Sequence, residues 1–301
     1  MTTVFSIAEY DYMADELVGV GRFERGSIER DLFPDGEHYL RVTTGVLDQH
    51  AVVIGGTISD KATLEIYDLG CAIVENGAST LTLIVPWYGY ATMDRASKPG
   101  EAVTAKNRAR IFSSIPAAKL GNQILLLDLH SEGIPHYFEG SLHPVHVYAK
   151  PVIESLARDL TGSDFILGST DAGRAKWFES LANELGVPAA FVYKRRRGPE
   201  ETEVTAVSMR FKGETVVIYD DMIRTGGSLL NAARAYREAG AGRLIAIATH
   251  GEFADRAFDR IRASGLFDAI ACTDSHPRAR ELRQQGLIVR PIAEMFCPFL
   301  R

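Results

Sequence analysis

A strand-to-helix segment at residues 215–239 carries the residue types best suited to chemistry. An apolar, β-branched run ends in Asp220 and Asp221, and the turn Thr225-Gly226-Gly227-Ser228 leads into an amphipathic helix. Glycines allow backbone N–H groups to face an anion, and the positive end of the helix points to the same place. We expect Ser228 to cap that helix. The pattern predicts a phosphate site beside two carboxylates, which suit sugar hydroxyls or a metal ion.

Glycine-rich turns of this kind also occur where nothing binds, because they let a helix pack closely on a sheet. The acidic pair favours a ligand site instead. Two adjacent carboxylates at a strand end repel each other unless they bind a cation or a hydroxyl group. Open α/β sheets bind their ligands at the carboxyl ends of their strands, where this pair is expected to lie.

Polar side chains also follow other strand-like runs. They comprise His130 in Asp128-Leu129-His130, Asp171 in Ser169-Thr170-Asp171-Ala172-Gly173, the basic run Lys194 to Arg197, and the acidic turn Phe33-Pro34-Asp35-Gly36-Glu37. Each has an ordinary structural interpretation as well. His130 could be a hydrogen-bonded structural residue, Asp171 a helix cap, and the basic run a solvated face. His143 and His146 have the spacing of a metal pair, but we expect them in an irregular surface loop.

Strand-like and helix-like runs alternate almost throughout the chain, which predicts parallel sheets with crossover helices. The expected strands are 50–56, 80–86, 123–130, 163–171, 188–196, 243–251 and 267–274. The expected helices are 63–76, 104–115, 147–160, 173–186 and one near 254–263, and the strand–loop–helix segment 215–239 adds one further strand and helix. Two doubly wound α/β halves are the simplest arrangement. We expect an N-terminal domain at 1–145 and a C-terminal domain at 146–301, whose final segment could pack back on the first domain.

Composition narrows the class of protein. The chain has 301 residues, 46% of them hydrophobic, and a formal net charge of −6. This acidic balance argues against nucleic-acid binding, which favours a basic surface. The 3 cysteines are far apart, which suggests a reducing compartment and no disulfide framework. We see no signal peptide and no apolar run long enough to span a membrane, so we expect a cytoplasmic protein.

Read in order, the motifs resemble those of the ribose-phosphate diphosphokinases, also called phosphoribosyl diphosphate synthetases. The resemblance covers about residues 30 to 250. It rests on FPDGE (33–37), PWYGYATMDR (86–95), VTAK (103–106), DLHS (128–131), STDAG (169–173), KRRR (194–197) and DDMIRTGGS (220–228), in the order of the family. Several motifs in register are far more specific than any one of them.

The resemblance implies a fold of two phosphoribosyltransferase-like domains and a role for each matching residue. His130 and Asp171 would help to hold Mg²⁺, and Lys194 and Arg196 would act on the transferring group from a mobile loop at about 194–204. Ribose 5-phosphate would be bound by Asp220, Asp221, Arg224, Thr225, Gly226, Gly227 and Ser228. The nucleotide, ATP, would be bound by Phe33, Asp35, Gly36, Glu37 and Arg95, with the acidic turn supplied by a neighbouring subunit of a dimer or hexamer.

Some positions depart from the family pattern. Thr92, Met93 and Ser97 stand where the family usually has an arginine, a glutamine and an acid that hold the nucleotide, and Arg224 replaces a common aspartate. Two other functions therefore remain open beside diphosphoryl transfer. One is a phosphoribosyltransferase that uses the product, and the other is a non-catalytic subunit that modulates an active partner.

Overall fold

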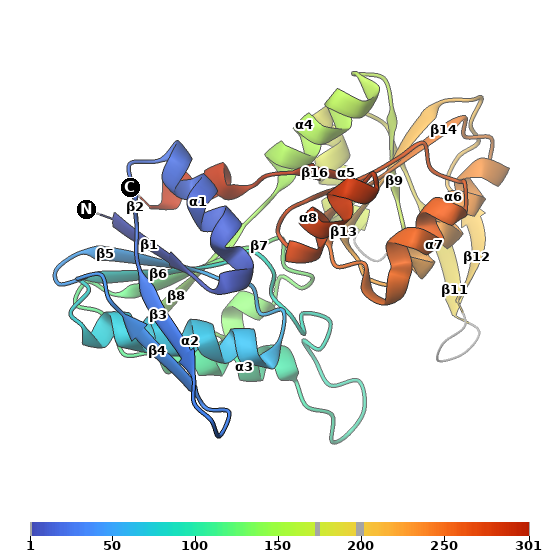
Figure 1. Cartoon of the computed structure of the whole chain (residues 1–301). Helices are drawn as coiled ribbons and strands as arrows, with labels where there is room; N and C mark the ends of the chain where they lie inside the picture. Colours follow the sequence, from blue (N-terminus) through green and yellow to red (C-terminus); the bar gives the residue numbers. More distant parts are fainter. Residues whose placement is uncertain (1, 172–174, 197–201, 301) are drawn as a thin grey trace. The chain divides into compact units, whose positions relative to one another are not determined.

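The computed structural model describes residues 2–171, 175–196 and 202–300, and the chain forms two compact units (Figure 1). Unit 1 comprises Met1–Tyr148 with Pro291–Arg301, and unit 2 comprises Ala149–Arg290. Each unit contains a 6-stranded sheet in which all neighbouring strands run parallel. The expected fold class, α/β with two parallel-sheet domains, is confirmed.

The sheet of unit 1 lies between helices on both faces. In spatial order its strands are β2 (Glu24–Arg25), β1 (Thr2–Ser6), β5 (His50–Ile54), β6 (Thr80–Val85), β7 (Asn122–Leu127) and β8 (Leu142–Val147). The helices are α1 (Asp11–Val20), α2 (Asp60–Glu75) and α3 (Thr104–Ser113), with short 3-10 turns η1 (Ala8–Tyr10), η2 (Ile134–Tyr137) and η5 (Ala293–Phe299). Figure 1 shows α1 on one face of the sheet and α2 and α3 on the other.

The sheet of unit 2 follows the same plan. Its strands are β10 (Ala189–Ala190), β9 (Ile166–Ser169), β13 (Thr215–Ile223), β14 (Arg243–Gly251), β15 (Ala269–Thr273) and β16 (Ile288–Arg290). Its helices are α4 (Lys150–Thr161), α5 (Ala175–Leu185), α6 (Gly227–Glu238), α7 (Ala257–Ala263) and α8 (Pro277–Leu282), with η3 (Ala254–Arg256) and η4 (Arg283–Gln285).

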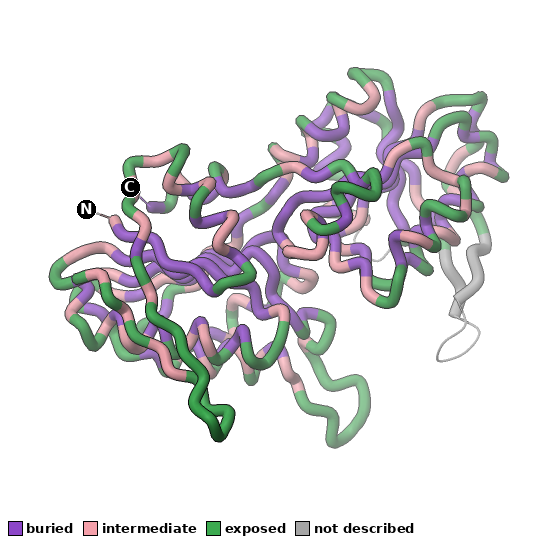
Figure 2. The backbone as a smooth tube through the Cα atoms, viewed as in Figure 1, coloured by how far each residue is buried: buried purple, intermediate pink, exposed green. Residues whose placement is uncertain are grey.

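Apolar runs explain why these strands are central. Val52, Val53 and Ile54 in β5 are fully buried, as are Val216, Val217 and Ile218 in β13. A strand covered on both faces needs apolar side chains at consecutive positions, and β-branched residues suit the pleated backbone. Figure 2 shows the buried strands at the centre of each unit and exposed positions on the outer faces of the helices.

Two antiparallel hairpins stand outside the sheets. β3 (Ile28–Leu32) pairs with β4 (His38–Val42) in unit 1, and β11 (Val192–Arg196) pairs with β12 (Thr202–Val207) in unit 2. The expectation of one sheet strand at 188–196 was therefore wrong. Only Ala189–Ala190 joins the sheet, because the chain then leaves it to pair with β12.

One smaller expectation was also wrong. His143 and His146 lie in edge strand β8 and not in an irregular loop. They are an odd number of positions apart in a strand, so they belong to opposite faces of the sheet and cannot share a metal ion. The helix expected near 254–263 is present, as the 3-10 turn η3 followed by α7 from Ala257. No helix in the described ranges is long and apolar enough to cross a membrane.

Candidate functional site

The turn between β13 and α6 begins at Arg224 and enters the helix through Gly226. Gly226 is the N-cap residue, with a φ of 77°, and its carbonyl oxygen accepts the first helical hydrogen bond, from the N–H of Leu230, at 2.9 Å. The expectation that Ser228 caps the helix was wrong. The left-handed glycine turns the chain into the helix early, so Ser228 already lies in the first helical turn and no side chain caps it.

Most residues of this turn are exposed. Thr225, Gly227 and Ser228 are exposed, while Gly226 is buried against α7. The first N–H groups of a helix have no partner within the helix, and here no capping side chain competes for them. The turn therefore has the geometry of an anion site at the positive end of a helix.

Substituting Gly226 is expected to damage the turn. A Cβ atom there would lie 2.8 Å from Ile261 Cδ1, and the positive φ strains any side chain. We expect Gly226→Ala to lower the free energy of unfolding by about 1–2 kcal/mol. Gly227→Ala is the matched control, because a Cβ atom at Gly227 meets open space. Urea unfolding of both variants tests this, and an equal loss in the two would contradict it.

The acidic pair lies in β13, where this strand runs beyond its neighbour β9. The last paired residues are Ser169 and Tyr219, so Asp220, Asp221 and Asp171 come together just past the end of β9. Thr170 Oγ1 donates to Asp220 Oδ2 at 2.8 Å, and the backbone N–H of Asp221 donates to Asp220 Oδ1 at 3.0 Å.

The electrostatics around Asp220 favour a ligand that carries a positive charge or hydroxyl groups. A small pocket of about 30 Å³ is lined by Ser169, Thr170, Asp171, Trp177, Phe178, Tyr219, Asp220 and Asp221. Burial, and next the negative charge of Asp221, raise the pKa of Asp220 well above its ordinary value. A group bringing a positive charge or hydroxyl donors would relieve this crowding of carboxylates.

The basic run lies in the β11–β12 hairpin. Lys194 pairs with Val204 and Arg196 with Thr202, and the register shifts between Tyr193 and Lys194. The loop expected at about 194–204 is thus partly strand, and residues 197–201 lie outside the described residues, as do Ala172 and Gly173 of the Asp171 motif.

The remaining predicted residues belong to unit 1. His130 follows β7 and is half-buried, while Arg95 is exposed in the segment between β6 and α3. The neighbouring carbonyl of Asp94 accepts a hydrogen bond from Tyr137 Oη at 2.5 Å. Among the described residues, no three His, Cys, Asp or Glu side chains gather into a potential metal cage.

The acidic turn Phe33–Glu37 connects β3 to β4. The N–H of Phe33 donates to Glu37 O at 2.8 Å and that of Gly36 to Phe33 O at 2.9 Å, which makes the tight turn that the sequence predicted. Phe33 is 47% exposed. An aromatic ring exposed at the tip of a hairpin is available to a ligand or to a partner.

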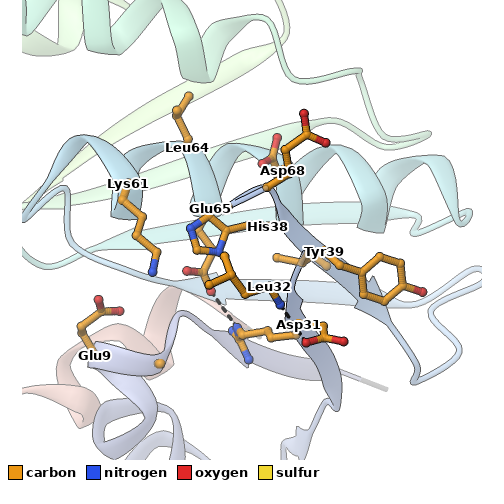
Figure 3. Close-up of a pocket in the computed structure, with 14 residues that line it drawn as sticks. Glu9, Asp31, Leu32, His38, Tyr39, Lys61, Leu64, Glu65 and Asp68 are labelled. Carbon is orange, nitrogen blue, oxygen red and sulfur yellow. Dashed lines mark hydrogen bonds and ion pairs between the residues drawn. The ribbon is translucent and has the colours of Figure 1, made fainter. Parts of the chain in front are cut away.

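A pocket of about 860 Å³ lies beside this hairpin (Figure 3). Its lining comes from η1, α2, β3, β4 and the turn, and comprises Ala8, Glu9, Arg30, Asp31, Leu32, Gly36, Glu37, His38, Tyr39, Leu40, Lys61, Leu64, Glu65 and Asp68. An ion pair of 2.8 Å joins Arg30 to Glu65, and both residues line the pocket. Gly36 and Glu37 thus share a pocket of which Arg95 is not part.

Comparisons with known proteins place this geometry in a family. Residues 2–115 match the model of the N-terminal domain of ribose phosphate pyrophosphokinase, and residues 149–276 match the phosphoribosyl transferase domain. A protein of Synechococcus elongatus named ribose-phosphate pyrophosphokinase is 30% identical over 296 residues, which cover 97% of this chain and 87% of that protein. The chain belongs to the ribose-phosphate pyrophosphokinase family.

Other ribose-phosphate pyrophosphokinases support this assignment. The one from Methanopyrus kandleri is 34% identical over 273 residues, 90% of each chain. The crystal structure of phosphoribosylpyrophosphate synthetase from Mycobacterium smegmatis superposes with a TM-score of 0.85 at 26% identity, covering 100% of this chain and 97% of that one. The resemblance that the motifs predicted is confirmed.

Two side chains at the site were not singled out in the sequence. Thr170 holds Asp220, and Glu252 lies 3.8 Å from Arg224. A signal for Glu252 does exist, because it directly follows β14 just as Arg224 directly follows the adjacent parallel strand β13.

Proposed function

We propose that this protein transfers the β,γ-diphosphoryl group of ATP to the 1-hydroxyl of ribose 5-phosphate. The hydroxyl oxygen attacks the β-phosphorus, the bond to the bridging α,β oxygen breaks, AMP leaves and the hydroxyl proton is lost. The observation that carries the proposal is the pocket lined by Asp171, Asp220 and Asp221, the last two in the strand that leads into the β13–α6 turn, in a member of this family.

The residues have distinct roles in this proposal. The turn from Thr225 to Ser228 binds the 5-phosphate, and Asp220 and Asp221 accept hydrogen bonds from the ribose hydroxyls. Lys194 and Arg196 stabilise the negative charge on the transferring group. Phosphoryl-type transfer needs positioning and charge stabilisation more than covalent help, which agrees with these residue types.

Magnesium suits the donors present. Mg²⁺ prefers oxygen ligands and usually combines one or two carboxylates with waters and substrate phosphates, so a full protein cage is not required. The exposed carboxylate of Asp171 fits that requirement, and we propose that it helps to hold the ion, while the role proposed for His130 rests on the motif resemblance alone. Bound Mg²⁺ would neutralise phosphate charge and orient the nucleotide.

We propose that the nucleotide is bound by Phe33, Asp35, Gly36, Glu37 and Arg95. The exposure of Phe33 at the tip of a hairpin supports a contribution of this turn to a neighbouring subunit in a homo-oligomer, a dimer or a hexamer. Sedimentation at several protein concentrations measures the assembly. A monomer that still releases AMP would contradict a shared site.

The test of the reaction is AMP release from ATP with ribose 5-phosphate and Mg²⁺, with phosphorus NMR of the product. We expect a diphosphate on C1 of the sugar and no AMP when the sugar is left out. Turnover only with the diphosphorylated sugar and a nucleobase would identify a phosphoribosyltransferase. The match of residues 2–115 to the N-terminal pyrophosphokinase domain favours the kinase. Inactivity with every triphosphate would favour a non-catalytic subunit.

Base selection should be weak, because Thr92 and Met93 offer few directional hydrogen bonds and both are exposed in the segment before α3. We expect Thr92→Arg combined with Met93→Gln to tighten ATP binding and to widen the ratio of kcat/KM between ATP and GTP. Steady-state kinetics of both proteins decide this. A natural protein that already prefers ATP by about 1,000-fold would show that other residues recognise the base.

A further inference from the structure

Arg224 and Glu252 lie next to each other because their strands are in register. β13 and β14 pair in parallel up to Ile223 and Gly251, and these two residues come next in each strand. Arg224 Nε lies 3.8 Å from Glu252 Oε2. The first residue of the phosphate turn, Arg224, is therefore in an ion pair with Glu252.

Glu252 is not an ordinary surface carboxylate. Its side chain is 28% exposed, and the Oε2 atom is buried without a hydrogen-bond partner among the described residues. Burial raises the pKa of Glu252, and the charge of Arg224 opposes that rise. A carboxylate that gives up water without gaining a hydrogen bond is costly, so the adjacent guanidinium is its main compensation.

The segment that carries Glu252 supports the whole turn. The N–H of Phe253 donates to Ile223 O at 2.9 Å, and Arg260 Nη2 donates to Thr225 O at 3.3 Å. Ile261 of α7 packs where a Cβ atom of Gly226 would lie. Glu252 thus belongs to a framework that sets the position of the residues around the anion site.

We propose that Glu252 is a positioning residue that holds the guanidinium of Arg224 at the turn, where it binds the 5-phosphate of the sugar. This inference rests on the proposed function and adds the source of affinity for the phosphorylated end. The ion pair with Glu252 is made at the Nε edge. A guanidinium has five N–H donors in a planar fork, so Arg224 need not leave Glu252 in order to bind a phosphate.

A competing arrangement makes the opposite prediction. If Glu252 merely occupied Arg224 until a phosphate displaced it, the arginine would contribute more to binding once Glu252 lost its charge. If Glu252 positions Arg224, the arginine contributes less once that charge is lost. The sign of the coupling between the two residues therefore separates the two arrangements.

The experiment is a double-mutant cycle of Arg224→Met and Glu252→Gln. Calorimetry measures Kd for ribose 5-phosphate in the presence of Mg²⁺ and α,β-methylene ATP, whose bridging carbon prevents the transfer. We expect Arg224→Met to raise Kd about 30-fold when Glu252 is present. When Gln replaces Glu252, we expect the same substitution to raise Kd by about 10-fold or less. Equal factors, or a larger factor with Gln, would overturn the proposal.

The matched control is Arg256→Met, which removes an exposed arginine from the same segment, where it pairs with Asp259 at 3.0 Å. It should leave Kd unchanged. AMP release by the natural protein is measured separately. Turnover together with an additive cycle would overturn only the positioning role, whereas a natural protein that neither binds the sugar phosphate nor releases AMP would overturn the proposed function as well.

Discussion

Replacing Lys194 or Arg196 with alanine is expected to lower kcat by about 100- to 1,000-fold, because each substitution removes a cationic side chain that acts mainly in the transition state. The Kd for ribose 5-phosphate should change little, since the sugar phosphate is assigned to the β13–α6 turn. Rapid-quench measurement of AMP formation gives kcat, and calorimetry with α,β-methylene ATP gives Kd.

The control for the Lys194 and Arg196 variants is Arg195, which lies between the two residues in the sequence. Arg195 belongs to the same strand and carries the same charge, so Arg195→Ala tests whether total charge or position matters. We expect at most about a threefold loss in kcat for Arg195→Ala, because a charge without a specific role contributes little. Losses of tenfold or less in all three variants would place the basic run on an inert surface.

Asp220→Asn is expected to reduce activity and to stabilise the ligand-free protein. The variant weakens a charged acceptor for the ribose hydroxyls, so kcat/KM for ribose 5-phosphate should fall about 100-fold. It also removes a buried negative charge beside Asp221, so the free energy of unfolding should rise by about 1 kcal/mol. Because the folded-state pKa is raised, this gain should be absent below the ordinary pKa of an aspartate and should grow as pH rises above it.

Asp274→Asn is the matched control. Asp274 is fully buried directly after strand β15 of the same sheet, but it pairs with Arg280 at 3.3 Å. Losing a compensated carboxylate leaves the arginine without that partner, so this variant should lose stability and keep its kcat. Thermal unfolding in EDTA and AMP release compare the two variants. A loss of stability in Asp220→Asn would show that the two carboxylates are not in conflict in the folded protein.

Local chemistry accounts for the features that were predicted correctly. Runs such as Val216-Val217-Ile218 predicted buried parallel strands, because a strand covered on both faces cannot tolerate polar side chains at alternate positions. The tight turn at Phe33–Glu37 follows from Pro, Asp and Gly in adjacent positions. The order of the motifs predicted the family. This order is a property of the sequence alone, so it can be recognised without knowing which distant residues are in contact.

Tertiary contacts decided the rest. Ser228 could not be excluded as the cap until the left-handed Gly226, packed against Ile261, set the start of α6. The separation of Ala189–Ala190 from β11 depends on pairing with a strand that comes later in the chain. The contact of Arg224 with Glu252 joins residues that are far apart in sequence, and it exists only because β13 and β14 are neighbours in register. Neither the identity nor the spacing of two such residues specifies which strands pair, because strand order is set by how all the apolar faces are buried together.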